Sequence, residues 1–189
     1  METARGWFGI GMEGVSKPGN AGALFRTAHA FGASFLFAVG DSPGIAATRA
    51  TDTSDATRHV PFYRWASVDA MALPRLCRLV GVELAEDAVP LPSFRHPPQA
   101  AYVLGPERGS LSAAMLARCD HVVRIPTRFA INLAVAGALV MYDRWIAMGR
   151  FPPRPVASGG PEAEAHPPAH GRPRFRRGTP ALLRGDECP

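Results

Sequence analysis

The hydrophobic positions of this chain alternate between short continuous apolar runs and stretches in which apolar residues recur every three or four positions. The continuous runs predict buried strands at residues 7–12, 34–39, 59–65, 79–84, 100–104 and 121–125. Helical spacing is found at residues 20–31, 68–78, 112–118 and 132–148, while the proline-rich residues 88–99 predict irregular structure. Strands that alternate with helices predict an α/β fold, with a mostly parallel sheet and helices on both faces.

The pattern changes near residue 149. Residues 150–189 hold nine of the 19 prolines and few large apolar residues, with seven arginines against four acidic residues. Such a segment cannot bury enough apolar surface to offset its chain entropy. We therefore expect one folded domain over residues 1–149 and a Pro/Arg-rich, largely disordered basic tail over residues 150–189.

The tail contains one dense basic cluster, in which four arginines surround an aromatic residue. Guanidinium groups bind phosphates and an aromatic ring stacks on bases, so RNA binding is one interpretation of the cluster. A solvated segment that keeps the chain soluble is the other interpretation. The four residues are Arg172, Arg174, Arg176 and Arg177.

Composition adds two constraints on partners and location. The formal net charge is +5, and Lys17 is the only lysine among 21 basic residues, so the balance favours a polyanionic partner. Cys77, Cys119 and Cys188 have no C-x-x-C spacing, which argues against a zinc site and a disulfide framework. The longest nearly apolar run, residues 129–142, is too short for a membrane span. We expect a cytoplasmic protein that needs neither a metal nor a membrane.

A G-x-G-x-x-G pattern follows the first predicted strand, at residues 9–14. In dinucleotide-binding folds this pattern opens directly into a helix whose N-terminus holds a pyrophosphate. Here residues 15–19 separate the glycines from the next predicted helix. The sequence therefore argues against a dinucleotide site.

Three short polar motifs lie far apart, each between apolar or glycine-rich neighbours. They are GNAGALFRTA at residues 19–28, VLGPERGSL at residues 103–111, and Ile125-Pro126 followed by AINLAVA at residues 130–136. Their order and content resemble the SpoU/TrmH branch of the SPOUT RNA methyltransferases. The resemblance covers residues 7–148 of the chain.

The resemblance implies a SPOUT-type C-terminal trefoil knot, S-adenosyl-L-methionine as cofactor, and a homodimer. The implied reaction is methylation of a ribose 2'-hydroxyl in tRNA or rRNA. Two alternatives stay open: a non-catalytic RNA-binding protein on the same fold, and methylation of an RNA base.

The resemblance also assigns roles to residues within the motifs. Arg26 is implied at the reacting hydroxyl, either in its own chain or in the partner's site, with Asn20, Glu107 and Asn132 in support. We expect Asn20 at or near the start of its helix, where its side chain acts as a cap. The implied cofactor-binding residues are Leu104, Gly105, Gly109, Ile125, Pro126, Ile131 and Asn132.

The third motif departs from the family pattern at two positions. Ala130 and Ala134 stand where the family has serines, and this loss motivates the non-catalytic alternative. Thr127 and Arg128 are candidates to replace the missing hydroxyls. Outside the motifs, Asp143 and Arg144 on the last helix predict an ion pair at the surface or at a dimer interface.

Overall fold

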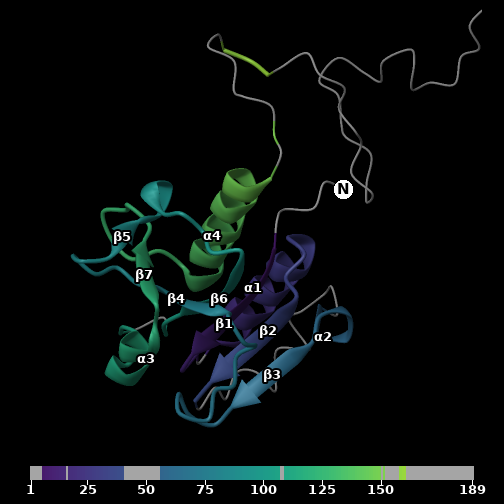
Figure 1. The fold of residues 1–189 in the computed structure, drawn as a ribbon, viewed down its shortest axis with the longest axis vertical. Helices are drawn as coiled ribbons and strands as arrows, with labels where there is room; N and C mark the ends of the chain where they lie inside the picture. Colours follow the sequence, from purple (N-terminus) through teal and green to yellow (C-terminus); the bar gives the residue numbers. More distant parts are fainter. Residues whose placement is uncertain are drawn as a thin grey trace, which may run out of the picture. The chain divides into compact units, whose positions relative to one another are not determined.

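The strands form one sheet in which every neighbouring pair is parallel. The computed structural model describes residues 6–15, 17–40, 56–106, 109–149, 151 and 158–160. The seven-stranded sheet has the order β3-β2-β1-β6-β4-β7-β5 (Figure 1). The strands are β1 (Trp7–Glu13), β2 (Phe35–Val39), β3 (Phe62–Trp65), β4 (Arg78–Val82), β5 (Val89–Pro90), β6 (Gln99–Leu104) and β7 (His121–Arg124).

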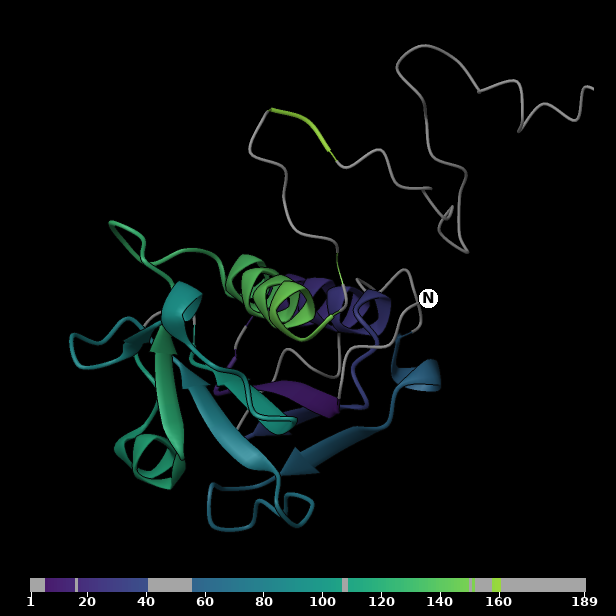
Figure 2. The same ribbon diagram turned by 45° about the horizontal axis from the view of Figure 1, so that its top comes forward.

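Helices cover both faces of this sheet. Helices α1 (Pro18–Ala30) and α4 (Leu133–Met148) lie side by side on one face, and α3 (Ala113–Arg118) lies on the opposite face (Figure 2). The short α2 (Ala56–His59) precedes β3. The predicted α/β fold with a mostly parallel sheet is confirmed, while the trefoil knot stays a prediction. No helix in the described ranges is long and apolar enough to cross a membrane.

The glycines of β1 are explained by the packing of the sheet. Alternate β1 residues, including Ile10, are buried against α1 and α4. Gly9 and Gly11 face the other side, where a Cβ would lie 2.2 Å from the Phe35 ring and 2.4 Å from the Phe37 ring. Gly9 and Gly11 therefore make room for aromatic packing, whereas Gly14 has a φ of +62° and open space around it.

The second face of the sheet is covered partly by a segment without helical structure. The helix predicted at residues 68–78 is wrong, because this segment consists of turns and extended chain. Met71 is buried against the sheet, and the Arg118 guanidinium donates to the carbonyls of Val68 and Met71. Pro74 lacks an amide hydrogen for a helix. Apolar spacing here reflects a loop laid over the core.

Several element ends also differ from the prediction. The helix predicted at residue 20 begins at Pro18, since a proline is well suited to the first helical position. Asn20 consequently lies within the first turn, and the N-cap residue is Lys17. The strand predicted from residue 59 begins at Phe62 because α2 extends to His59. The segment predicted as irregular contains β5 and a 3-10 turn, Leu91–Ser93.

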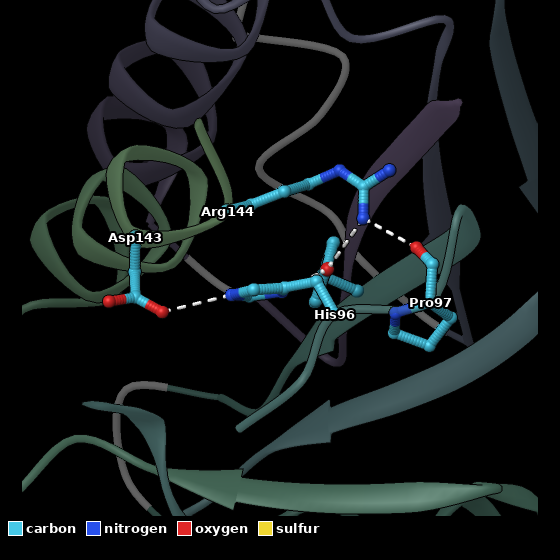
Figure 3. A network of polar contacts seen from close by, with 5 residues as sticks. His96, Pro97, Asp143 and Arg144 are labelled. Atoms are coloured by element: carbon cyan, nitrogen blue, oxygen red, sulfur yellow. Dashed lines mark hydrogen bonds and ion pairs between the residues drawn. The ribbon is translucent and has the colours of Figure 1, made fainter. Parts of the chain in front are cut away.

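A buried arginine fixes α4 to the sheet. Arg144 is only 2% exposed, and its guanidinium donates to the carbonyl of Pro97 at 2.6 Å (Figure 3). It also donates to the carbonyls of Pro98 (3.0 Å) and Trp7 (3.2 Å). The predicted ion pair between Arg144 and Asp143 at a surface or interface is wrong. The two side chains leave the helix in different directions, and backbone carbonyls accept the hydrogen bonds of the arginine.

The same network contains a buried histidine whose hydrogen bonds define its tautomer. His96 Nε2 lies 2.9 Å from Asp143 Oδ2, and His96 Nδ1 lies 2.6 Å from the Tyr102 hydroxyl (Figure 3). Burial lowers the pKa of His96, and although Asp143 opposes this effect, burial prevails. In neutral His96, Nε2–H donates to Asp143 and Nδ1 accepts the Tyr102 proton. The Tyr102 oxygen in turn accepts from Arg144 at 3.2 Å.

This arrangement predicts that acid destabilises the fold through His96. The pKa of His96 is lower in the folded chain than in the unfolded chain, where it has the ordinary histidine value of 6.5. As the pH falls below 6.5, the unfolded chain therefore binds more protons than the folded chain. The free energy of unfolding should then decrease by at most about 1.4 kcal/mol per pH unit through this group. Urea unfolding of the unaltered protein and of His96→Gln between about pH 7 and pH 5 measures the difference in slope. Equal slopes would contradict the prediction.

Candidate functional site

A pocket lies at the carboxyl ends of three neighbouring strands, where the segments after β4, β6 and β7 meet. In open parallel sheets, ligands bind in crevices at this end of the strands. The pocket walls are mostly apolar with exposed backbone. The lining residues are Val82, Glu83, Leu84, Leu104, Gly105, Pro106, Gly109, Ile125, Thr127, Ala130, Ile131, Leu133 and Ala136.

The second sequence motif forms one wall of the pocket. Leu104, Gly105 and Gly109 line it, and their assignment to cofactor binding stays a prediction. A Cβ on Gly105 would lie 3.1 Å from the backbone nitrogen of Leu111, and Gly109 has a φ of +116°. Both glycines are needed because the loop folds back closely on itself. Glu107, which also belongs to this motif, lies outside the described residues.

The third motif forms the facing wall. Ile125 and Ile131 line the pocket as predicted, whereas Pro126 is exposed and lies beside the lining residues. Ala130 lines the pocket without contributing a hydroxyl. The Thr127 hydroxyl instead donates to the Phe129 carbonyl at 2.9 Å. The Thr127 hydroxyl therefore stabilises its own loop. The pocket has alanine at the positions where the family has serine.

Two asparagines connect the first motif to the third. Asn132 is the N-cap of α4, and its Oδ1 accepts from the backbone nitrogens of Ala134 (2.9 Å) and Val135 (3.4 Å). Since Oδ1 is thereby fixed as an acceptor, the amide Nδ2 points the other way and donates to Asn20 Oδ1 at 2.9 Å. This hydrogen bond holds α1 close to Asn132, which directly follows the pocket-lining residue Ile131.

Arg26 of the first motif does not belong to the described wall of the pocket. It lies on α1 and is exposed. The tail cluster falls outside the described residues; its members are Arg172, Arg174, Arg176 and Arg177.

Sequence reasoning missed two carboxylates that hold the second motif in place. Glu83 lines the pocket, and its two oxygens accept from the backbone nitrogens of Leu111 (2.8 Å) and Leu84 (3.0 Å). Glu13 accepts from the backbone nitrogen (2.9 Å) and hydroxyl (2.7 Å) of Ser112. Glu13 ends β1 and Glu83 follows β4. A glutamate at the carboxyl end of a predicted parallel strand is the sequence signal that could have indicated these two residues.

The two cysteines that the structure describes show no catalytic or metal-binding arrangement. Cys77 and Cys119 are free thiols, and burial raises the pKa of each to about 11. Both are therefore protonated and poorly nucleophilic at neutral pH. In the described part of the chain, no group of three histidine, cysteine or acidic side chains is placed to hold a metal ion.

Substitutions of Asn132 separate its two hydrogen-bonding roles. Asn132→Ala removes the helix cap and should lower the free energy of unfolding by about 1 kcal/mol. Asn132→Asp keeps the capping oxygen but cannot donate to Asn20, so it should retain stability while loosening the connection between the motifs. Thermal unfolding measures the first effect, and amide exchange of the first turn of α1 measures the second. Equal exchange in Asn132→Asp and the unaltered protein would contradict the assigned donor.

Comparison with known proteins gives one consistent result. A family model described as the SpoU rRNA Methylase family matches residues 8–142. The 23S rRNA (guanosine-2'-O-)-methyltransferase RlmB of Acinetobacter baylyi is 26% identical over 143 residues, which cover 71% of this chain and 57% of that protein.

Solved structures share the fold. An AdoMet-bound rRNA methyltransferase from Sinorhizobium meliloti has a TM-score of 0.65 at 24% identity, with 77% of this chain and 58% of that chain covered. A structure concerned with the 2-OH methylation of C/U34 on tRNA has a TM-score of 0.64 at 26% identity, with 77% and 92% covered. The chain thus spans less than two thirds of the first two relatives and nearly all of the third.

Proposed function

We propose, because the chain belongs to the SpoU rRNA methylase family, that it transfers a methyl group from S-adenosyl-L-methionine to a ribose 2'-hydroxyl of RNA. The three motifs that resemble the family fall within the matched residues. One observation carries the proposal: the Asn20–Asn132 hydrogen bond holds the first motif beside a pocket whose walls are the second and third motifs.

The pocket fits an adenosine-containing cofactor. Leu104, Ile125 and Ile131 offer apolar walls for a flat base, and the backbone at Gly105 and Gly109 is open to close approach. When bound, S-adenosyl-L-methionine supplies a methyl group that its positive sulfonium makes electrophilic.

The chain must then make the ribose oxygen nucleophilic. A ribose hydroxyl is a very weak acid, so negative charge developing on its oxygen needs a fixed positive partner. We assign this role to Arg26, because a guanidinium orients the oxygen and stabilises its charge but does not remove the proton. An RNA phosphate is the proposed acceptor of the hydroxyl proton as the bond from sulfur to the methyl group breaks. Asn20, Asn132 and Glu107 are assigned supporting roles at the reacting end of the pocket.

A second copy of the chain is the proposed partner of α4. Four large apolar side chains recur at helical spacing along its outer surface and are 36–50% exposed; they are Val135, Leu139, Tyr142 and Ile146. Such a continuous apolar stripe is typical of a protein interface. Arg26 lies outside the described wall of its own pocket, which supports a homodimer in which Arg26 completes the partner's site.

The proposed substrate is tRNA rather than rRNA. The chain spans 92% of the structure concerned with 2-OH methylation of C/U34 on tRNA, but only 57% of the 23S rRNA enzyme. We propose tRNA because the similarity to the tRNA-related structure extends over nearly all of that chain. We further propose a cytoplasmic location and phosphate contacts from the tail arginines.

Calorimetric titration with S-adenosylmethionine and S-adenosylhomocysteine, followed by incubation with tRNA and nucleoside mapping, tests the proposal. We expect micromolar binding of both ligands and a 2'-O-methylated nucleoside. Failure to bind either ligand, with RNA present, would favour the non-catalytic RNA-binding alternative. A methylated base would favour the base-methylation alternative.

A further inference from the structure

Glu83 is the one charged side chain among the described residues that line the pocket. It follows β4 directly, and the other described walls are apolar side chains, glycines, proline and the threonine hydroxyl. A carboxylate placed in such surroundings acts strongly on any charged ligand, because apolar walls screen charge less than water does.

The Glu83 carboxylate is held in one position. One oxygen accepts from Leu111 at 2.8 Å and the other from Leu84 at 3.0 Å. A Cβ on Gly105 would lie 3.6 Å from Glu83 Oε2, so the carboxylate packs against the cofactor loop as well. These two bonds use about half of the roughly four acceptor sites of a carboxylate. The group therefore fixes the loop and still presents its charge to the pocket.

We infer that Glu83 makes the pocket selective for the positively charged cofactor over its neutral product. This inference rests on the proposed function. S-adenosylmethionine carries one more positive charge than S-adenosylhomocysteine, because loss of the methyl group converts the sulfonium into a thioether. The Glu83 carboxylate attracts the positively charged cofactor before methyl transfer. It attracts the product less, because the product lacks the sulfonium charge. Glu83 would therefore favour exchange of product for fresh cofactor.

Glu83→Gln tests the inference by removing the charge at nearly constant shape. We expect its affinity for S-adenosylmethionine to fall about tenfold more than its affinity for S-adenosylhomocysteine. Isothermal titration of both ligands, at one ionic strength, gives the ratio directly. The ratio separates charge from loop positioning, since a displaced loop weakens both ligands alike.

Glu13→Gln is the matched control. Glu13 holds Ser112, the neighbour of Leu111, through two hydrogen bonds, but it does not line the pocket. Its substitution should change both affinities by the same factor. Thermal unfolding of both variants establishes that they are folded.

Two results would overturn the inference in different ways. Equal losses for both ligands in Glu83→Gln would reduce Glu83 to a loop-positioning residue, with the proposed function intact. Binding of neither ligand to the unaltered protein would overturn the proposed function and this inference together.

Discussion

Replacing Arg26 with alanine is expected to lower the rate of methyl transfer by about 10²–10³-fold, as removal of a single charge-stabilising group does in other enzymes. The affinity for S-adenosylmethionine should stay within about twofold, since an interaction made only in the transition state leaves ground-state binding unchanged. Single-turnover transfer from labelled cofactor to tRNA measures the rate, and calorimetry measures the affinity. Arg75→Ala, at another exposed arginine, is the control for a general loss of positive charge.

Two further variants define how Arg26 acts. Near-normal turnover of Arg26→Lys would contradict a specific guanidinium role, because lysine keeps the charge but loses the planar donors. Mixing Arg26→Ala with Gly105→Val distinguishes the two possible placements. If Arg26 serves the partner's pocket, mixed dimers regain one intact site. If it serves its own pocket, mixing restores nothing.

Replacing Arg144 with methionine should lower the free energy of unfolding by about 1–3 kcal/mol, the cost of leaving a buried hydrogen-bonding group unsatisfied. Methionine fills much of the space, but the carbonyls of Pro97, Pro98 and Trp7 lose the guanidinium donor, and of these Pro98 keeps the backbone nitrogen of Trp7 as a donor. A buried acceptor that is left unpaired is costly. The Tyr102 hydroxyl also loses a donor, which weakens the hydrogen bonds of His96. Urea unfolding followed by circular dichroism measures the change.

The control for this substitution is Arg75→Met, on an exposed side chain. A surface substitution away from caps and networks should change stability by no more than about 0.5 kcal/mol. A loss below about 1 kcal/mol in Arg144→Met would show that water replaces the guanidinium, contrary to its 2% exposure.

Local signals in the sequence predicted much of this structure. Continuous apolar runs located β1, β2 and β6 to within one residue, because strands buried on both faces need apolar side chains at every position. Ser112 and Asn132 begin their helices as side-chain caps, and each caps through contacts with residues two or three positions ahead.

Contacts between distant residues account for what was missed. The sequence predicted Arg144 at a surface or a dimer interface and gave His96 no role, yet the two residues are connected across 48 positions of sequence through Tyr102. The helix predicted at residues 68–78 failed because Arg118, far along the chain, binds its carbonyls. Glu83 was overlooked for the same reason, since its partner Leu111 belongs to another loop.

Helix α4 is one continuous helix that contributes residues to two different surfaces. Leu133 and Ala136 line the pocket, while Leu139 and Tyr142 belong to the apolar stripe on its outer side. Hydrogen bonds hold the start of the helix at Asn132 and its C-terminal half at Arg144. A movement of one surface is therefore expected to move the other. In the proposed homodimer, cofactor binding and dimer assembly would therefore be thermodynamically linked: the factor by which the cofactor raises the dimerisation constant is the factor by which dimerisation raises cofactor affinity.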